Sequence, residues 1–182
     1  MVASSLEKLQ ENYDLDINWR SYQLRPPGSP PMSPQRLEQI KASRPQFQQR
    51  AREQYGVEIN SGPMNINSRP ALIAEKYAES QGKGKEFHEA VMHAYWQQAR
   101  DISDINLLQE IAAGVGLDTG DFLAILGNPE FDAEVSADID LAREYGLDGV
   151  PALIFADKYL VMGAQPYNVL KQVVERVQAE NT

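Results

Sequence analysis

The sequence predicts an α/β fold that carries a large helical insertion. Three observations lead to this fold class. Residues 33–145 show the repeated three- and four-residue spacing of apolar side chains that is typical of helices. The apolar run ALIFA at 152–156 and a second short segment at 159–162 then predict two neighbouring strands. From Pro166 onward the apolar positions return to the helical spacing.

The N-terminal part predicts one helix and one strand. Residues 4–12 place Leu6 and Leu9 on one face of a helix. The segment LDINWRSYQL at 15–24 alternates apolar and polar side chains, with a change of phase near Ser21. We therefore expect a strand with a bend or a bulge at this serine. Five prolines within residues 25–34 predict a loop after it.

The helical block has recognisable starts and breaks. Ser33 and Pro34 form a cap followed by a first-turn proline. Pro45 is expected to interrupt the helix that begins there, because proline lacks the N–H that an internal helical position needs. Asp157 and Lys158 are expected to turn the chain between the two predicted strands, and Pro166 suits the start of the last helix.

Composition excludes several classes of function. The 182 residues carry 17 lysines and arginines against 26 aspartates and glutamates, a net charge of −9. Such a charge argues against a general binder of nucleic acid or anionic membranes. No apolar run approaches the roughly 18 residues that span a bilayer. The first residues lack the pattern of a signal peptide, so we expect a cytoplasmic protein.

The 182 residues contain no cysteine, which removes disulfides, thiolate catalysis and cysteine-ligated zinc from them. His88 and His93 are five positions apart and therefore do not share a helix face, so no metal site is predicted. Ser4 and Ser5 have neither a GxSxG context nor an obvious histidine partner. No catalytic residue is assigned.

Val150-Pro151 is the most informative pair. A proline at the entry to a buried strand must sit where no ladder hydrogen bond is needed. On the residues alone a trans bond is favoured, because only about 5–6% of X–Pro bonds in folded proteins are cis. The functional alternative is a cis-proline that holds neighbouring backbone groups toward a cleft.

The stretch GVPALIFADKYLVMGAQPYNVL, which begins at Gly149, resembles the C-terminal half of a DsbA-family thioredoxin-like domain. More narrowly, it resembles the FrnE-like branch, which is related to 2-hydroxychromene-2-carboxylate isomerases and kappa-class glutathione transferases. Residues 67–118 are similar to that family's helical insert, and residues 17–24 to its second strand. The resemblance implies a thioredoxin-like part at 1–32 and 146–182 and a helical insertion at 33–145.

The family pattern places a strand and a CxxC motif, or a serine in the isomerases, before the first helix. Here Met1 to Leu6 already resembles the inside of that helix. The chain therefore lacks the first strand and the motif, and we expect the natural protein to begin upstream of Met1. Without a central strand, residues 17–24 and ALIFA would flank an unfilled gap.

The resemblance implies thiol–disulfide exchange with a thiol or disulfide substrate. Pro151 would be cis, Val150 would pair with an extended substrate, and Ala164 and Gln165 would hold an anionic group such as a glutathione carboxylate. Asn67 lies where the family's insert approaches the cleft. Glutathione would be a co-substrate, with no bound cofactor, and a homodimer stays open.

Two other functions remain. One is a glutathione-dependent isomerase with serine in the cysteine position. The other is a non-catalytic thioredoxin-like binding protein, which the absence of cysteine would fit.

Overall fold

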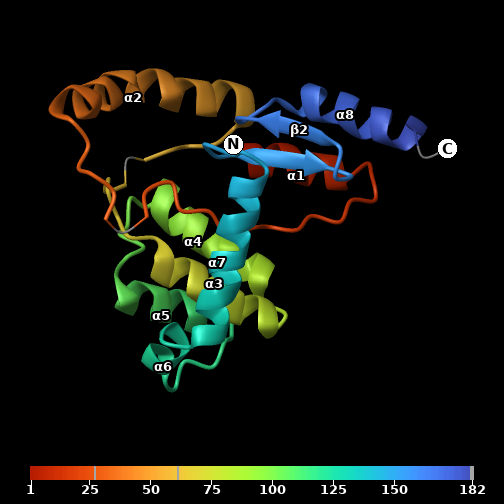
Figure 1. Ribbon diagram of the computed structural model, residues 1–182. Helices are drawn as coiled ribbons and strands as arrows, with labels where there is room; N and C mark the ends of the chain where they lie inside the picture. Colours follow the sequence, from red (N-terminus) through yellow and green to blue (C-terminus); the bar gives the residue numbers. More distant parts are fainter. Residues whose placement is uncertain (27, 61, 181–182) are drawn as a thin grey trace. The chain divides into compact units, whose positions relative to one another are not determined.

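The computed structural model describes residues 1–26, 28–60 and 62–180. Two strands, β1 (Ala152–Phe155) and β2 (Tyr159–Met162), form an antiparallel pair in which Ala152 faces Met162 and Phe155 faces Tyr159 (Figure 1). The helices are α1 (Val2–Gln10), α2 (Pro34–Tyr55), α3 (Arg69–Ser80), α4 (Gly84–Trp96), α5 (Ile105–Gly114), α6 (Phe122–Leu126), α7 (Pro129–Glu144) and α8 (Tyr167–Glu180). The α/β fold with a large helical block, expected from the sequence, is confirmed.

The chain divides into two compact units. One consists of Met1–Trp19, Met32–Glu58 and Gly146–Thr182, and the other of Arg20–Pro31 and Ile59–Tyr145. From the sequence we expected the helical insertion to span residues 33–145 and therefore to include α2. The contacts instead group α2 with the N-terminal and C-terminal segments of the chain. The buried side chains of Ala51 and Tyr55 anchor α2 in this first unit.

The first unit has its core on one face of the β1–β2 pair. Leu6 and Leu9 of α1 pack with Leu170 and Val174 of α8, as Figure 1 shows for the two helices beside the strands. The strand side chains that join this core are Leu153, Phe155 and Val161. They alternate along the strands with exposed side chains such as Ile154 and Leu160, as the two-residue period of a strand requires.

The expected strand at 15–24 is not formed, and that prediction is wrong. Leu15, Ile17 and Trp19 do pack against the core of the first unit, so their apolar character was interpreted correctly. No strand among the described residues lies beside this segment to form a ladder. Extended residues become a β-strand only when a neighbour pairs with their backbone.

Pro45 does not interrupt α2, which runs without a break from Pro34 to Tyr55. The start was predicted correctly, because the Ser33 side chain accepts a hydrogen bond from the Arg36 N–H at 3.2 Å. The helix is exposed along most of its length around Pro45. We attribute the continuity to solvent, which can hydrate the carbonyl oxygen that loses its N–H partner.

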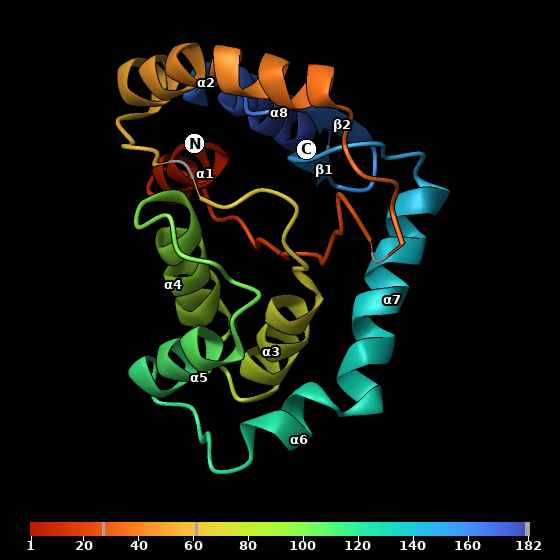
Figure 2. The ribbon, with the colours of Figure 1, turned by 90° about the vertical axis from the view of Figure 1, so that its left-hand side faces the viewer.

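The second unit is a helical body in which α3, α4 and α5 pack together (Figure 2). Its core includes Phe87 of α4 and Leu108 of α5, both fully buried. The three- and four-residue spacing of apolar positions predicted these helices correctly. None of the described helices is long and apolar enough to cross a membrane.

A buried ion pair lies inside the second unit. The Asp138 carboxylate on α7 lies 2.9 Å from the Lys76 ammonium on α3, and both side chains are almost fully buried. Arg20 donates to the same carboxylate at 3.1 Å, and the Ser21 N–H donates to it at 2.9 Å. Asp138 therefore fixes the segment around Ser21 to the helical body.

The hydrogen bonds and opposite charges around Asp138 and Lys76, rather than burial, decide the direction in which their pKa values shift. Burial by itself would raise the pKa of Asp138, but the Ser21 hydrogen bond and the Lys76 ammonium outweigh burial and lower it. Burial would likewise lower the pKa of Lys76, and its bonds to Asp138 and Glu79 raise it instead. Both groups thus stay charged in the folded protein near neutral pH.

We expect Asp138→Asn to lower the free energy of unfolding by about 3–5 kcal/mol, because it leaves the buried Lys76 ammonium without its counter-charge. Urea unfolding followed by circular dichroism measures the change. Asp140→Asn is the matched control on the same helix, since Asp140 pairs with Arg143 at the surface. An exposed pair of this kind contributes about 1 kcal/mol or less.

The difference in the free energy of unfolding between wild type and Asp138→Asn should depend on pH. Because folding lowers the pKa of Asp138, its charge stabilises the fold above the ordinary aspartate pKa. That contribution is lost as the pH falls through the lowered pKa of the folded state. A difference that stayed constant down to strongly acidic pH would contradict this assignment.

Candidate functional site

The candidate site begins where the chain enters β1. The Val150–Pro151 peptide bond is cis, as the family resemblance implied and contrary to the expectation from the residues alone. Val150 is 55% exposed. Within the described part of the chain, its backbone N–H and C=O form no hydrogen bond. Val150 thus offers peptide groups that an approaching extended chain could use.

The loop between β2 and α8 lies against this entry. The Gly163 N–H donates a hydrogen bond of 2.8 Å to the Pro151 carbonyl. Gly163 has φ of +78°, a conformation that glycine adopts without steric cost. The Gln165 side-chain amide turns back and donates to the Met162 carbonyl at 2.9 Å. Ala164 and Gln165, two of the predicted site residues, are therefore brought next to Pro151.

Two buried side-chain hydroxyls donate hydrogen bonds to backbone carbonyls of this loop. The Tyr55 hydroxyl, at the end of α2, donates to the Ala164 carbonyl at 2.7 Å. The Ser5 hydroxyl, in the first turn of α1, donates to the Gln165 carbonyl at 3.3 Å. The exposed fractions of Tyr55 and Ser5 are only 5% and 4%, so water does not compete freely for either bond. We call these two contacts the hydroxyl clamp.

The clamp also places the N-terminus of α1 beside the loop. The helix begins at Val2, and no side chain caps its first turn. Its free N–H groups carry the positive end of the helix dipole. A negative group next to Pro151 would therefore face a favourable field from α1.

Asn67, the remaining predicted site residue, belongs to the second unit. There its side-chain oxygen accepts a hydrogen bond of 3.1 Å from the Arg69 N–H at the start of α3. Its assignment to substrate binding stays a prediction.

The histidines and the carboxylates suggest no second site. His88 lies 2.7 Å from the Glu75 carboxylate, between α4 and α3. No group of three or more histidine, aspartate or glutamate side chains that could hold a metal ion occurs within the described ranges.

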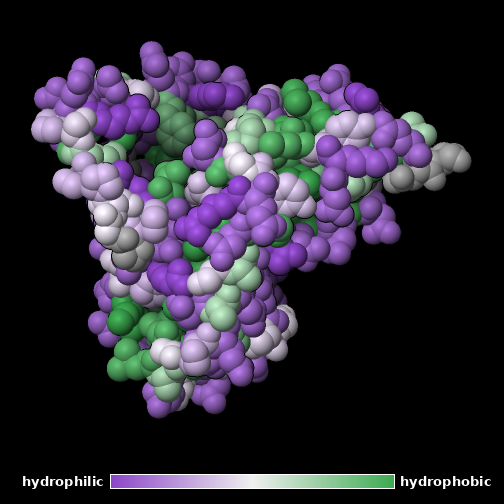
Figure 3. Space-filling view, in the orientation of Figure 1, coloured by the Kyte–Doolittle hydropathy of each residue, from purple (hydrophilic) through white to green (hydrophobic). Residues whose placement is uncertain are grey.

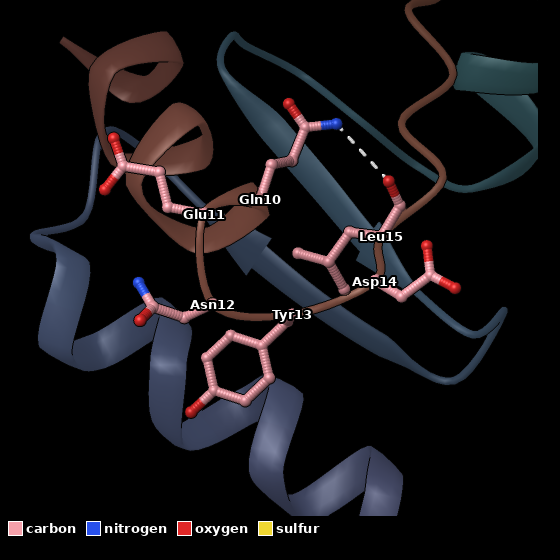
Figure 4. Close-up of a pocket in the computed structure, with 6 residues that line it drawn as sticks. All are labelled: Gln10, Glu11, Asn12, Tyr13, Asp14 and Leu15. Carbon is pink, nitrogen blue, oxygen red and sulfur yellow. Dashed lines mark hydrogen bonds between the residues drawn. The ribbon is translucent and has the colours of Figure 1, made fainter.

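A surface hollow lies at the other end of α1. Its lining comes from one segment, Gln10 to Leu15, as Figure 4 shows. The Gln10 amide bonds across it to the Leu15 carbonyl, and the Tyr13 hydroxyl points to α8, where it donates to Glu175. The hollow lies a helix length, about 13 Å, from the first turn of α1 and is separate from the candidate site.

The sequence analysis missed Tyr55 and the structural role of Ser5. Tyr55 fits the apolar stripe of a helix, and its partner Ala164 is 109 residues away in the chain. Ser5 and Gln165 are 160 residues apart. No local pattern reports contacts over such distances.

Comparison with known proteins shows the family to which the chain belongs. The family model of the DSBA-like thioredoxin domain matches residues 1–175. The chain belongs to this family. Among curated proteins, the uncharacterized protein YwbO of Bacillus subtilis is 27% identical to this chain over 176 residues. The alignment covers 94% of this chain and 86% of YwbO.

Two solved structures share the fold of the DSBA-like chain. A probable DsbA oxidoreductase, SCO1869 from Streptomyces coelicolor, superposes with a TM-score of 0.83 at 24% identity, covering 99% of this chain and 84% of that one. A 2-hydroxychromene-2-carboxylate isomerase superposes with a TM-score of 0.80 at 21% identity, covering 99% and 90%. The predicted relationship to both groups is confirmed at the level of fold.

We expect Tyr55→Phe to loosen the loop at 163–166, because the half-buried Ala164 carbonyl loses its hydroxyl donor and keeps only the longer contact of 3.4 Å with the Arg50 guanidinium. The cost should be about 0.5–1.5 kcal/mol, as for the net loss of one hydrogen bond. Amide hydrogen exchange, read by mass spectrometry, should become faster in peptides that cover residues 150–166.

Tyr77→Phe is the matched control. The Tyr77 hydroxyl also donates to a backbone carbonyl, that of Asp118, at 2.9 Å, but at an exposed position in the second unit. Its loss should leave exchange at residues 150–166 unchanged. Equal exchange in wild type and Tyr55→Phe would show that the clamp does not hold the loop.

Proposed function

We propose that the chain carries the substrate-binding side of a thiol–disulfide oxidoreductase. Val150, Pro151, Ala164 and Gln165 would receive an extended thiol or disulfide substrate. The nucleophilic cysteine would belong to a segment outside the 182 residues, which contain none. We place the reaction in the cytoplasm, with glutathione as a candidate co-substrate.

The unpaired backbone of Val150 carries this proposal. Val150 is exposed, its peptide groups form no hydrogen bond within the described residues, and the loop beside it is held by the hydroxyl clamp. An extended peptide could add to such an edge as a short strand, in which main-chain hydrogen bonds supply the affinity. Membership in the DSBA-like family supports the same type of substrate.

The chemistry is an exchange of sulfur partners. A thiolate of the protein attacks one sulfur of a substrate disulfide, forms a mixed disulfide, and releases the other sulfur as a thiolate. A second cysteine then attacks the mixed disulfide, which leaves the substrate as a dithiol and the protein oxidised. The residues described here would hold the substrate sulfur in line and would stabilise the thiolate through the positive end of α1.

A backbone-modified peptide tests the binding mode. The probe is a capped pentapeptide with a central cysteine, titrated into the ¹⁵N-labelled protein and followed by NMR. N-methylation of the peptide N–H that faces Val150 should weaken binding about two- to tenfold, because one main-chain hydrogen bond is lost. N-methylation of the next N–H, which points away in an extended strand, is the matched control.

Equal weakening by both modifications, or by neither, would contradict strand addition at Val150. A lack of chemical shift changes around Val150 and Ala164 with any of the peptides would contradict the binding site itself.

The location of the nucleophile is tested by intact mass and thiol titration of the protein isolated from the cells that produce it. A mass above that of the 182 residues, with two reactive thiols, is the expected result. A larger mass without thiols would support a serine-type enzyme, and a mass equal to the 182 residues would support a binding protein.

A glutathione-dependent isomerase is the second candidate, favoured by the fold shared with the 2-hydroxychromene-2-carboxylate isomerase. Binding of glutathione without any dithiol reductase activity would support it. The third candidate, a thioredoxin-like interaction protein, would use the Val150 edge to bind extended segments without chemistry.

A further inference from the structure

One arginine beside the candidate site forms no ion pair with any carboxylate of the described residues. Arg50 lies on α2, and its Nη2 is 3.4 Å from the Ala164 carbonyl. Its Nε donates to the Gln54 side-chain oxygen at 3.0 Å. Both acceptors are neutral, and no ion pair with Arg50 is present in the part of the chain that the structure describes. The exposed guanidinium therefore keeps donors for a further acceptor.

The neighbouring arginine on the same helix provides a contrast. Arg52 binds Glu58 through two hydrogen bonds, of 2.6 Å from Nε and 3.0 Å from Nη2. The Arg52 guanidinium, through its hydrogen bond, lowers the pKa of Glu58. The charge of Arg52 is thus neutralised locally, whereas that of Arg50 is not.

Arg50 also belongs to the basic part of an acidic protein. The whole chain has a net charge of −9, whereas α2 contains five basic and two acidic residues, a net charge of +3. Figure 3 shows hydrophilic atoms over the outer surface of α2, at the upper left. A negatively charged ligand approaching this unit is attracted to α2 rather than to the rest of the chain.

The distance to Pro151 fits one extended ligand. Arg50 contacts the Ala164 carbonyl, and the neighbouring residue Gly163 bonds to the Pro151 carbonyl at 2.8 Å. These links place the guanidinium within about 10 Å of Pro151. An extended peptide advances about 3.3–3.6 Å per residue, so about three residues span the gap.

We propose that Arg50 binds a carboxylate of the substrate, so that the site selects extended thiol or disulfide peptides with an acidic residue within about three positions of the sulfur. This inference rests on the proposed function and names its substrate class. The hydroxyl clamp supports it, because Tyr55 fixes the Ala164 carbonyl against which Arg50 is held. Guanidinium and carboxylate groups match in geometry and form charge-assisted hydrogen bonds.

Two capped pentapeptides with a central cysteine test the proposal. One carries glutamate two residues from the cysteine, and the other carries glutamine there. NMR titration at low salt should give a dissociation constant about three- to tenfold lower for the glutamate peptide. The preference should shrink at 300 mM NaCl, because salt screens an exposed pair.

Arg50→Gln should abolish the preference, so that the glutamate and glutamine peptides bind the variant with equal affinity. Arg52→Gln is the matched control on the same helix and should retain the preference. Loss of the preference in both variants would overturn the assignment to Arg50, since it would show only the general field of α2.

The remaining outcomes separate this inference from the function on which it rests. Equal affinity of the wild type for both peptides would overturn the acidic preference alone. Failure of both peptides to bind would overturn the proposed function together with it. Glutathione is titrated in parallel, and Arg50-dependent binding of glutathione but not of the glutamate peptide would assign the carboxylate to the small thiol and overturn the choice of an acidic peptide.

Discussion

The arrangement of the first unit depends on one requirement, that buried backbone groups find hydrogen-bond partners. Between β2 and α8 the chain leaves the ladder and has not yet begun the helix, so its carbonyls need other donors. Tyr55 and Ser5 supply them from α2 and α1. The same two bonds bring α1, α2 and the Pro151 region to one place, so satisfying the backbone also builds the candidate site.

In the second unit, a buried ion pair fixes the position of a loop segment. Asp138, Lys76 and the backbone of Ser21 meet where a loop crosses the helical body. Burying one charge alone would be costly, but the pair together with its hydrogen bonds is tolerated. Such an arrangement adds little to stability compared with apolar packing, and we interpret it as a device that fixes one position of the Ser21 segment.

The functional interpretation follows from what the first unit leaves unpaired. Within the described residues Val150 has free peptide groups and Arg50 has no carboxylate partner, while the loop at 163–166 is held by hydrogen bonds to Pro151, Tyr55 and Ser5. Free groups on a fixed frame are what a binding site needs, because little conformational entropy is lost when the ligand arrives. Because the chain belongs to the DSBA-like family, we propose that the reactive atom of the ligand is a sulfur. The 182 residues themselves contain no cysteine that could attack it.

The sequence by itself determined the fold class, most helix positions, the β1–β2 pair and the relevance of Val150-Pro151. These follow from local periodicity, capping residues and a distinctive C-terminal stretch, which short segments of chain can encode. It did not determine the state of residues 15–24, because a strand exists only through its neighbour. It also gave no sign of Tyr55, Ser5 or Arg50 at the site, since their partners lie more than a hundred residues away. Only the tertiary structure decided those contacts, because hydrogen bonds between distant segments depend on where the whole unit places them.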